Sequence, residues 1–245
     1  MSPPKSMSLS HKLFLPLLPF LFTTGARAFS AMPLKKIFCY GDSLTAGTTP
    51  GREPHLFPYA PMLETQLKQE HQNESFAVRW KGFPGWMAAS MVENQLVDGV
   101  GLRALIQNKG IDLCVLLAGT NDLGMLLSTE SDKNKAAEVI AQSIMSLHDI
   151  AHEEGVLTLA IGIPSSGYQA KVPDAKEIRI KANNILQNWC DEKEGQAFFV
   201  EFPFDWSPGD ERWGADGLHF SELGYSEIAK CIAPKVYERT SNTLR

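Results

Sequence analysis

The stretch KKIFCYGDSLTAGTTPG, residues 35–51, passes from two lysines through a short apolar run into glycine, aspartate and serine. The apolar and aromatic run predicts a buried β-strand over 35–40. A strand that ends on Gly41, Asp42 and Ser43 brings a polar side chain to one edge of a sheet. These residues are also suited to an ordinary strand-to-helix turn, because glycine permits unusual backbone angles and aspartate or serine can cap a helix.

Along the rest of the chain, apolar runs alternate with amphipathic ones. The apolar runs predict strands over 35–40, 75–80, 111–118, 156–162 and 197–202, and the amphipathic runs predict helices over 56–71, 99–109, 134–154, 174–193 and 221–238. This alternation is typical of an α/β domain with a parallel sheet covered by helices. The third and fourth runs are nearly free of polar residues, so we expect them at the centre of the sheet. Active sites of such sheets lie beyond the carboxyl ends of the strands.

Two further loops place polar side chains near that edge. Asn121 and Asp122 follow the strand predicted over 111–118, where an asparagine amide can donate to a developing oxyanion; an Asx turn or helix cap is the alternative. Outside the predicted helices, His219 is the histidine with an aspartate, Asp216, three residues before it. The carboxylate could hold one ring nitrogen while the other takes a proton from a serine. A turn before a helix is the alternative for this pair.

A glycine-rich turn at 81–86 contains Gly85, whose backbone N–H could serve as a second oxyanion donor. With it, the chain resembles the GDSL, or SGNH, hydrolase family. Gly41-Asp42-Ser43-Leu44 matches the first block of the family, Gly85 the second, Gly119-Thr120-Asn121-Asp122 the third and Asp216-Gly217-Leu218-His219 the last, in the family's order. The resemblance extends over nearly all of 35–225 and is nearest to single-domain arylesterases and lysophospholipase-like esterases.

The resemblance implies a three-layer α/β/α, flavodoxin-like fold with a five-stranded parallel sheet, and hydrolysis of carboxylic esters through an acyl-enzyme. It implies that Ser43 attacks the acyl carbonyl, that His219 accepts and returns the proton, and that Asp216 orients the imidazole. The backbone N–H groups of Ser43 and Gly85 and the side chain of Asn121 would form the oxyanion hole. No metal or other cofactor is expected.

Aromatic residues near the ends of the strands are candidates for the wall of a substrate pocket. They are Trp86, Phe204, Trp206 and Trp213, with packing in the core as the alternative. Small acyl or aryl esters are the preferred substrates, and lysophospholipids, thioesters and acetylated carbohydrates stay open. Two other functions stay open as well: an acyltransferase that uses the same site, and a non-catalytic glycan-binding module on the same fold.

The composition limits the choice of partner. The chain has 245 residues, 44% of them hydrophobic, and a formal net charge of -5 without a cluster of lysine and arginine. These values fit one globular domain and argue against nucleic acid or an anionic membrane surface as the main partner. Cys39, Cys114, Cys190 and Cys231 lack C-x-x-C spacing and are predicted to be reduced. The G-x-G-x-x-A match at 99–104 does not follow a clear strand, so it does not predict a dinucleotide site.

The first residues differ from the rest of the chain. A run of ten apolar residues with two prolines among them, residues 13–22, is too short to span a membrane and is followed by Ala26-Arg27-Ala28. This pattern predicts a secretory signal over 1–28, removed after Ala28, and an esterase domain over 29–245. A plastid presequence that ends near Ala28 is the alternative. On the secretory route Asn73 would be the one N-glycosylation acceptor.

Overall fold

A computed structural model describes residues 33–51 and 55–241. The predicted targeting segment 1–28 lies outside the described residues.

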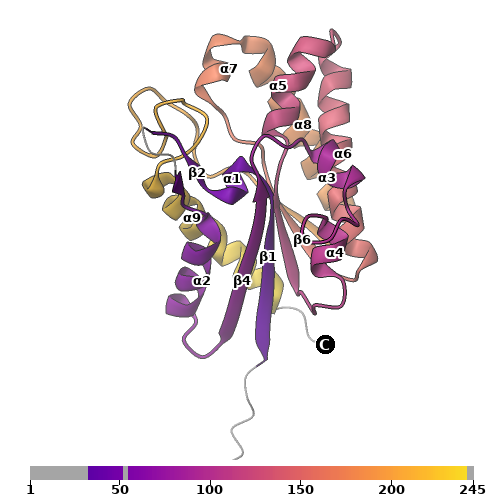
Figure 1. The fold of residues 1–245 in the computed structure, drawn as a ribbon, viewed down its shortest axis with the longest axis vertical. Helices are drawn as coiled ribbons and strands as arrows, with labels where there is room; N and C mark the ends of the chain where they lie inside the picture. Colours follow the sequence, from indigo (N-terminus) through magenta and orange to yellow (C-terminus); the bar gives the residue numbers. More distant parts are fainter. Residues whose placement is uncertain (1–32, 52–54, 242–245) are drawn as a thin grey trace, which may run out of the picture. The chain divides into compact units, whose positions relative to one another are not determined.

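A parallel sheet forms the centre of the described domain (Figure 1). Its strands are β1 Leu34–Asp42, β4 Ser75–Phe83, β5 Leu113–Leu117, β6 Leu157–Ile161 and β7 Ala197–Val200, in the order β4-β1-β5-β6-β7. Every neighbouring pair in this sheet is parallel. The predicted five-stranded parallel sheet is therefore confirmed, with ends that differ by up to three residues. The short strands β2 Thr48–Thr49 and β3 His55–Leu56 form a separate antiparallel pair.

Helices cover both faces of the sheet. They are α1 Ser43–Ala46, α2 Tyr59–Glu70, α3 Ala88–Glu93, α4 Leu102–Ile106, α5 Thr120–Thr129, α6 Lys133–Glu153, α7 Gly167–Lys171, α8 Pro173–Glu192 and α9 Glu222–Ser241. Figure 1 shows α2 and α9 on one side of the sheet and α3, α4, α6 and α8 on the other. The five predicted helices are present as α2, α4, α6, α8 and α9, so the three-layer α/β/α prediction is confirmed.

The two-residue period of a strand explains the two cores. Along β1, Ile37 and Cys39 pack with α2 and α9, whereas Phe38 and Tyr40 pack with α3, α4, α6 and α8. All five residues of β5 are buried, as expected for a central strand covered on both faces. The apolar character of both strand faces is therefore what requires a layer of helices on each side.

The topology places one crevice at the carboxyl edge of the sheet. The chain moves from β1 outward to β4, and then crosses back to β5 on the other side of β1. Connections that leave adjacent strands in opposite directions open a crevice between them, where ligands of open α/β sheets bind. Here the crevice lies between the ends of β1 and β5, where Ser43 and Asn121 follow.

Gly41 is required by the close approach of β1 and β5. A Cβ atom on Gly41 would lie 1.9 Å from the backbone oxygen of Leu117 and 2.6 Å from Oγ1 of Thr45. We expect Gly41→Ala to lower the free energy of unfolding by about 3 kcal/mol or more, because buried backbone has little freedom to move aside. Urea denaturation followed by circular dichroism measures this change.

Gly124→Ala is the matched control for that experiment. Gly124 lies within α5, and a Cβ atom there would meet nothing within 4 Å. It should leave stability unchanged or raise it by up to about 1 kcal/mol, since alanine favours helix. Equal effects of the two substitutions would contradict the close-approach argument.

Candidate active site

A chain of hydrogen bonds joins Ser43, His219 and Asp216. Nε2 of His219 lies 2.9 Å from Oγ of Ser43, and Nδ1 of the same ring lies 2.7 Å from Oδ2 of Asp216. The serine and the histidine are 176 positions apart in the sequence. The fold thus brings together the three residues that the sequence predicts to act as nucleophile, base and orienting acid.

Ser43 is held by the end of its strand. Asp42 is the N-cap of α1, and its Oδ1 accepts the backbone N–H of Leu44 at 2.9 Å. This cap ends β1 and begins a short helix whose first residue is Ser43. The helix ends after one turn at Gly47, which has a positive φ of 79°. The serine side chain is therefore fixed at the carboxyl edge of the sheet by backbone contacts on both sides.

The loop before α9 holds His219. Oδ1 of Asp216 accepts the backbone N–H groups of Leu218 and His219, each at 3.0 Å, while Oδ2 contacts the imidazole. Partial burial alone would raise the Asp216 pKa, but the hydrogen bonds from His219 and the two backbone groups outweigh it and hold the pKa below its usual range. The carboxylate is therefore ionised at neutral pH and favours a proton on the Nδ1 that faces it.

The segment that contains Gly85 is tied to the loop after β5. Gly85 has a positive φ of 80°, in a turn closed by a hydrogen bond from the Trp86 N–H to the Phe83 oxygen at 3.1 Å. Nδ2 of Asn121 donates to the backbone oxygen of Trp86 at 2.9 Å. The two predicted oxyanion donors therefore lie on segments joined by a direct contact.

Asp122 adds a second link between the same segments. Its two carboxylate oxygens accept the backbone N–H of Ala88 at 3.1 and 2.9 Å, and the residue is only 4% exposed. Burial raises its pKa, and these backbone hydrogen bonds reduce that rise. The sequence pattern predicts for Asp122 only a role in a turn or a helix cap. Its cross-loop role depends on a contact between residues 34 positions apart, for which the local sequence carries no signal.

A cleft of about 410 Å³ lies beside these groups, and we call it the Asn121 cleft. It is lined by Thr120, Asn121, Leu123, Gly124, Ser166, Tyr168, Gln169, Asp216 and Leu218. Because Asn121 and Asp216 share this cleft, a bound ester can reach both the oxyanion-donor side and the histidine side of the site. Ser166 and Gln169, from the start of α7, were not identified in the sequence.

The four aromatic residues predicted to line a substrate pocket lie in different surroundings. Phe204 and Trp213 are each 7% exposed and pack with Phe220 in the core, at ring-centroid distances of 5.6 and 4.6 Å. These two therefore correspond to the packing alternative, because they join the core that α2 and α9 form on one face of the sheet. Trp86 stacks on Phe83, and Trp206 lines a different cavity from the Asn121 cleft.

Among the described residues, the structure gives no support for a metal site or a dinucleotide site. Within 33–51 and 55–241, no group of three or more His, Cys, Asp or Glu side chains is arranged to hold a metal ion. None of the helices that the structure describes is both long and apolar enough to cross a membrane. The G-x-G-x-x-A segment forms a turn that leads from α3 into α4 and follows no strand. The four cysteines are free, three of them buried.

Comparison with known proteins identifies the family. The model of the GDSL-like lipase/acylhydrolase family matches residues 39–226. The chain belongs to this family. It is therefore a hydrolase that acts on ester bonds. A search of curated proteins found no match.

Solved structures of GDSL-type and related esterases share the fold of this GDSL-family hydrolase. An aryl esterase of M. smegmatis superposes with a TM-score of 0.62 at 17% identity, over 83% of this chain and 99% of that one. A carbohydrate acetylesterase from Sinorhizobium meliloti gives 0.60 at 17% identity, over 83% and 99%. A lipase/acylhydrolase from Enterococcus faecalis gives 0.57 at 21% identity, over 84% and 96%. At these identities the similarity shows the three-layer fold.

The contact between Asp122 and Ala88 predicts a positioning role in this hydrolase. We expect Asp122→Ala to lower kcat by about 10- to 100-fold with little change in KM, because the Gly85 segment would move relative to Asn121. Steady-state kinetics on p-nitrophenyl acetate measures both constants.

Asp122→Asn is the matched variant, because its amide oxygen still accepts one N–H from Ala88. It should recover most of the kcat lost in Asp122→Ala. A loss in the Asn variant as large as that in the Ala variant would assign the effect to charge instead of position.

Asp42 predicts a specific dependence of stability on pH. Burial, the largest cause, raises the pKa of Asp42 to about 7; the Leu44 N–H opposes the rise, and the charge of Asp122 adds to it. In an unfolded chain the value is about 3.9. Between these two values the folded state keeps a proton that the unfolded chain releases. The contribution of Asp42 to stability is therefore fully present below about pH 4 and falls as the pH rises through 7.

Asp42→Asn removes this titration and keeps the cap oxygen. Relative to the parent chain, Asp42→Asn should become more stable as the pH rises from 4 to 7, by on the order of a few kcal/mol in total. Above pH 7 the difference should not grow further. Denaturant unfolding of both proteins across this range gives the difference. Buried His148 makes stability depend on pH in the opposite direction, because burial lowers its pKa to about 3. Its contribution is the same in both proteins, so it cancels in their difference. A constant difference between the two proteins would overturn this assignment.

Proposed function

We propose that this hydrolase cleaves carboxylic esters of small acyl or aryl groups through an acyl-enzyme formed on Ser43. The observation that carries the proposal is the hydrogen-bond chain from Ser43 through His219 to Asp216, at 2.9 and 2.7 Å. A serine becomes nucleophilic at neutral pH when an adjacent base accepts its proton, and both distances lie within direct hydrogen-bond reach.

The proposed reaction has two stages. Oγ of Ser43 attacks the acyl carbonyl as Nε2 of His219 takes its proton, and the same imidazolium then gives that proton to the leaving alcohol. Water then attacks the carbonyl of the acyl-enzyme as Nε2 of His219 takes one of its protons. The imidazolium gives that proton to Oγ of Ser43 as the bond between Oγ and the acyl group breaks, and the carboxylic acid leaves. Asp216, ionised because of its lowered pKa, stabilises the imidazolium in both stages.

Three donors are proposed for the oxyanion: the backbone N–H groups of Ser43 and Gly85 and the side chain of Asn121. The Asn121 amide uses one N–H on the Trp86 oxygen and has a second to offer. A Cβ atom at Gly85 would meet nothing within 4 Å, so no neighbouring atom crowds this position where a side chain would stand. The contact of Asn121 with Trp86 supports a donor that is fixed in place before a substrate arrives.

The aryl esterase among the structural neighbours favours small acyl or aryl esters as substrates, and the carbohydrate acetylesterase keeps acetylated sugars as the second candidate. Transfer of the acyl group to another alcohol would use the same residues. We also propose that residues 29–245 form the mature enzyme and that it enters the secretory pathway, on the basis of the sequence pattern of 1–28.

Removal of the Ser43 hydroxyl tests the proposal directly. We expect Ser43→Ala to lose both p-nitrophenyl acetate hydrolysis and labelling by a fluorophosphonate probe, with an unchanged circular dichroism spectrum. Cleavage of acetate and octanoate esters by the parent chain gives its acyl-length preference. A folded Ser43→Ala protein that keeps full turnover would place the chemistry elsewhere.

Asn121→Ala tests the oxyanion hole. Removal of one such donor typically lowers kcat by about 10²- to 10³-fold, because the charge of the tetrahedral intermediate loses a fixed partner. Fluorophosphonate labelling and kcat should be measured on the same preparation, with Asn188→Ala, a surface position on α8, as control. Unchanged turnover in Asn121→Ala would exclude its side chain from the reaction.

A further inference from the structure

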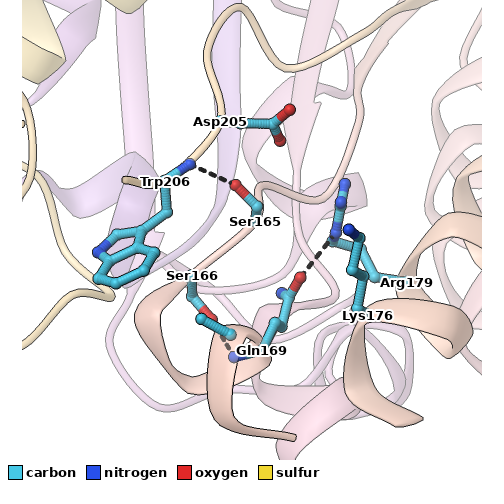
Figure 2. Close-up of a pocket in the computed structure, with 8 residues that line it drawn as sticks. Ser165, Ser166, Gln169, Lys176, Arg179, Asp205 and Trp206 are labelled. Atoms are coloured by element: carbon cyan, nitrogen blue, oxygen red, sulfur yellow. Dashed lines mark hydrogen bonds between the residues drawn. The ribbon is translucent and has the colours of Figure 1, made fainter. Parts of the chain in front are cut away.

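A second cavity of about 290 Å³ lies next to the Asn121 cleft, and we call it the Arg179 cavity (Figure 2). The two share Ser166 and Gln169, at the start of α7, as common wall residues. Figure 2 shows Lys176 and Arg179 on one side of the cavity and Ser165 and Trp206 on the other. The chemistry assigned to Ser43 does not use this cavity.

Arg179 is held in place without a counter-ion. Its Nε donates to Oε1 of Gln169 at 2.8 Å, and Nε2 of the same amide donates to the Pro164 oxygen at 3.1 Å. Arg179 makes no ion pair with any residue in the described part of the chain. Burial lowers its pKa even though the more distant charges of Asp205 and Glu201 act to raise it. The guanidinium is therefore fixed and only partly compensated in charge.

Lys176 adds a second cation to the same wall. It lies one helical turn before Arg179 on α8, and within the described ranges its amine contacts no carboxylate. Lys181, on the same helix, differs in this respect, because it contacts Glu177 at 2.8 Å. The two cations of α8 that line the cavity thus have no carboxylate within ion-pair distance among the described residues.

Hydroxyl groups complete a set of donors. Oγ of Ser165 accepts the backbone N–H of Trp206 at 2.6 Å, and Oγ of Ser166 accepts the backbone N–H of Gln169 at 3.4 Å. Each hydroxyl therefore has its own hydrogen to donate. The one carboxylate that lines the cavity is the exposed Asp205. Donors outnumber acceptors, which suits a ligand rich in acceptor oxygens.

We propose that the Arg179 cavity binds a carboxylate group. The planar fork of a guanidinium matches the two oxygens of a carboxylate, and charge-assisted hydrogen bonds of this kind are among the strongest in proteins. A singly charged group fits better than a doubly charged phosphate, because Asp205 repels any anion that enters. The carboxylate can belong to an ester substrate that also occupies the Asn121 cleft or to a separate small acid.

Calorimetric titration of Ser43→Ala with benzoate, and with benzamide as its uncharged match, tests binding without turnover. Benzoate should bind more tightly than benzamide, and Lys176→Met in this background should weaken benzoate by about tenfold. Lys176 is exposed and makes no hydrogen bond or ion pair with the described residues, so the variant should fold. Lys230→Met, an exposed position on α9, is the control for general loss of positive charge.

The direction in which Asp205→Asn changes the affinity for benzoate decides whether the cavity binds an anion. If the cavity binds an anion, loss of the repelling carboxylate should tighten benzoate several-fold, opposite to the effect of Lys176→Met. If both variants weaken benzoate, or if benzoate and benzamide bind equally, the proposal is overturned.

Kinetics on the parent background identifies the source of the carboxylate. A p-nitrophenyl half-ester of succinic acid is compared with p-nitrophenyl butyrate. If the carboxylate is part of the substrate, Lys176→Met should raise KM for the half-ester alone. If it belongs to a separate acid, Lys176→Met should leave both KM values unchanged and weaken only benzoate binding. Failure of Ser43 as nucleophile would abolish neither calorimetric result, so the two proposals fail separately.

Discussion

The parallel pairing of β1 with β5 is the constraint on which the rest of the site depends. Gly41 lies opposite Leu117 in this register, and the absence of a side chain lets the strands meet so closely. The nucleophile segment leaves the end of one strand, and the Asn121 loop leaves the end of the other. Since the chain leaves these two strands in opposite directions, a crevice opens where polar side chains from both can meet.

Around that crevice, carboxylates in different environments are held in different states. Asp216 accepts hydrogen bonds from the imidazole and two backbone groups, so its charged form is favoured. Asp42 is buried and within reach of the charge of Asp122, so its neutral form is favoured up to about pH 7. Two acids around one sheet edge can thus serve separate tasks, one electrostatic and one structural.

Hydrogen bonds between different loops hold the parts of the site in place relative to one another. Asn121 and Asp122 both contact the segment that follows Gly85, and the start of α7 forms a wall common to two cavities. The loop of Asp216 is also tied to α7, through a hydrogen bond from the Gly167 N–H to the Gly217 oxygen at 2.7 Å. Each side chain in the proposed mechanism is therefore positioned by a neighbour that is distant in the sequence.

The sequence by itself determined the layers of the fold and the residue types at the sheet edge. Periods of two and of 3.6 residues are local signals, and they predicted the five strands and the five helices that carry the core. The helices α3, α5 and α7 were not predicted, and α3 and α7, with six and five residues, have too few turns to show a period. Ser43 and Asn121 were identifiable because each follows a predicted strand, and Asp216 and His219 because they come just before the predicted C-terminal helix. Only the tertiary structure decided the strand order, the burial of Phe204 and Trp213, the clamp made by Asp122 and the unpaired cations of the Arg179 cavity. The physical reason is that burial and charge compensation depend on which segments pack together, and residues far apart in the chain acquire these properties only when the sheet brings their ends to one edge.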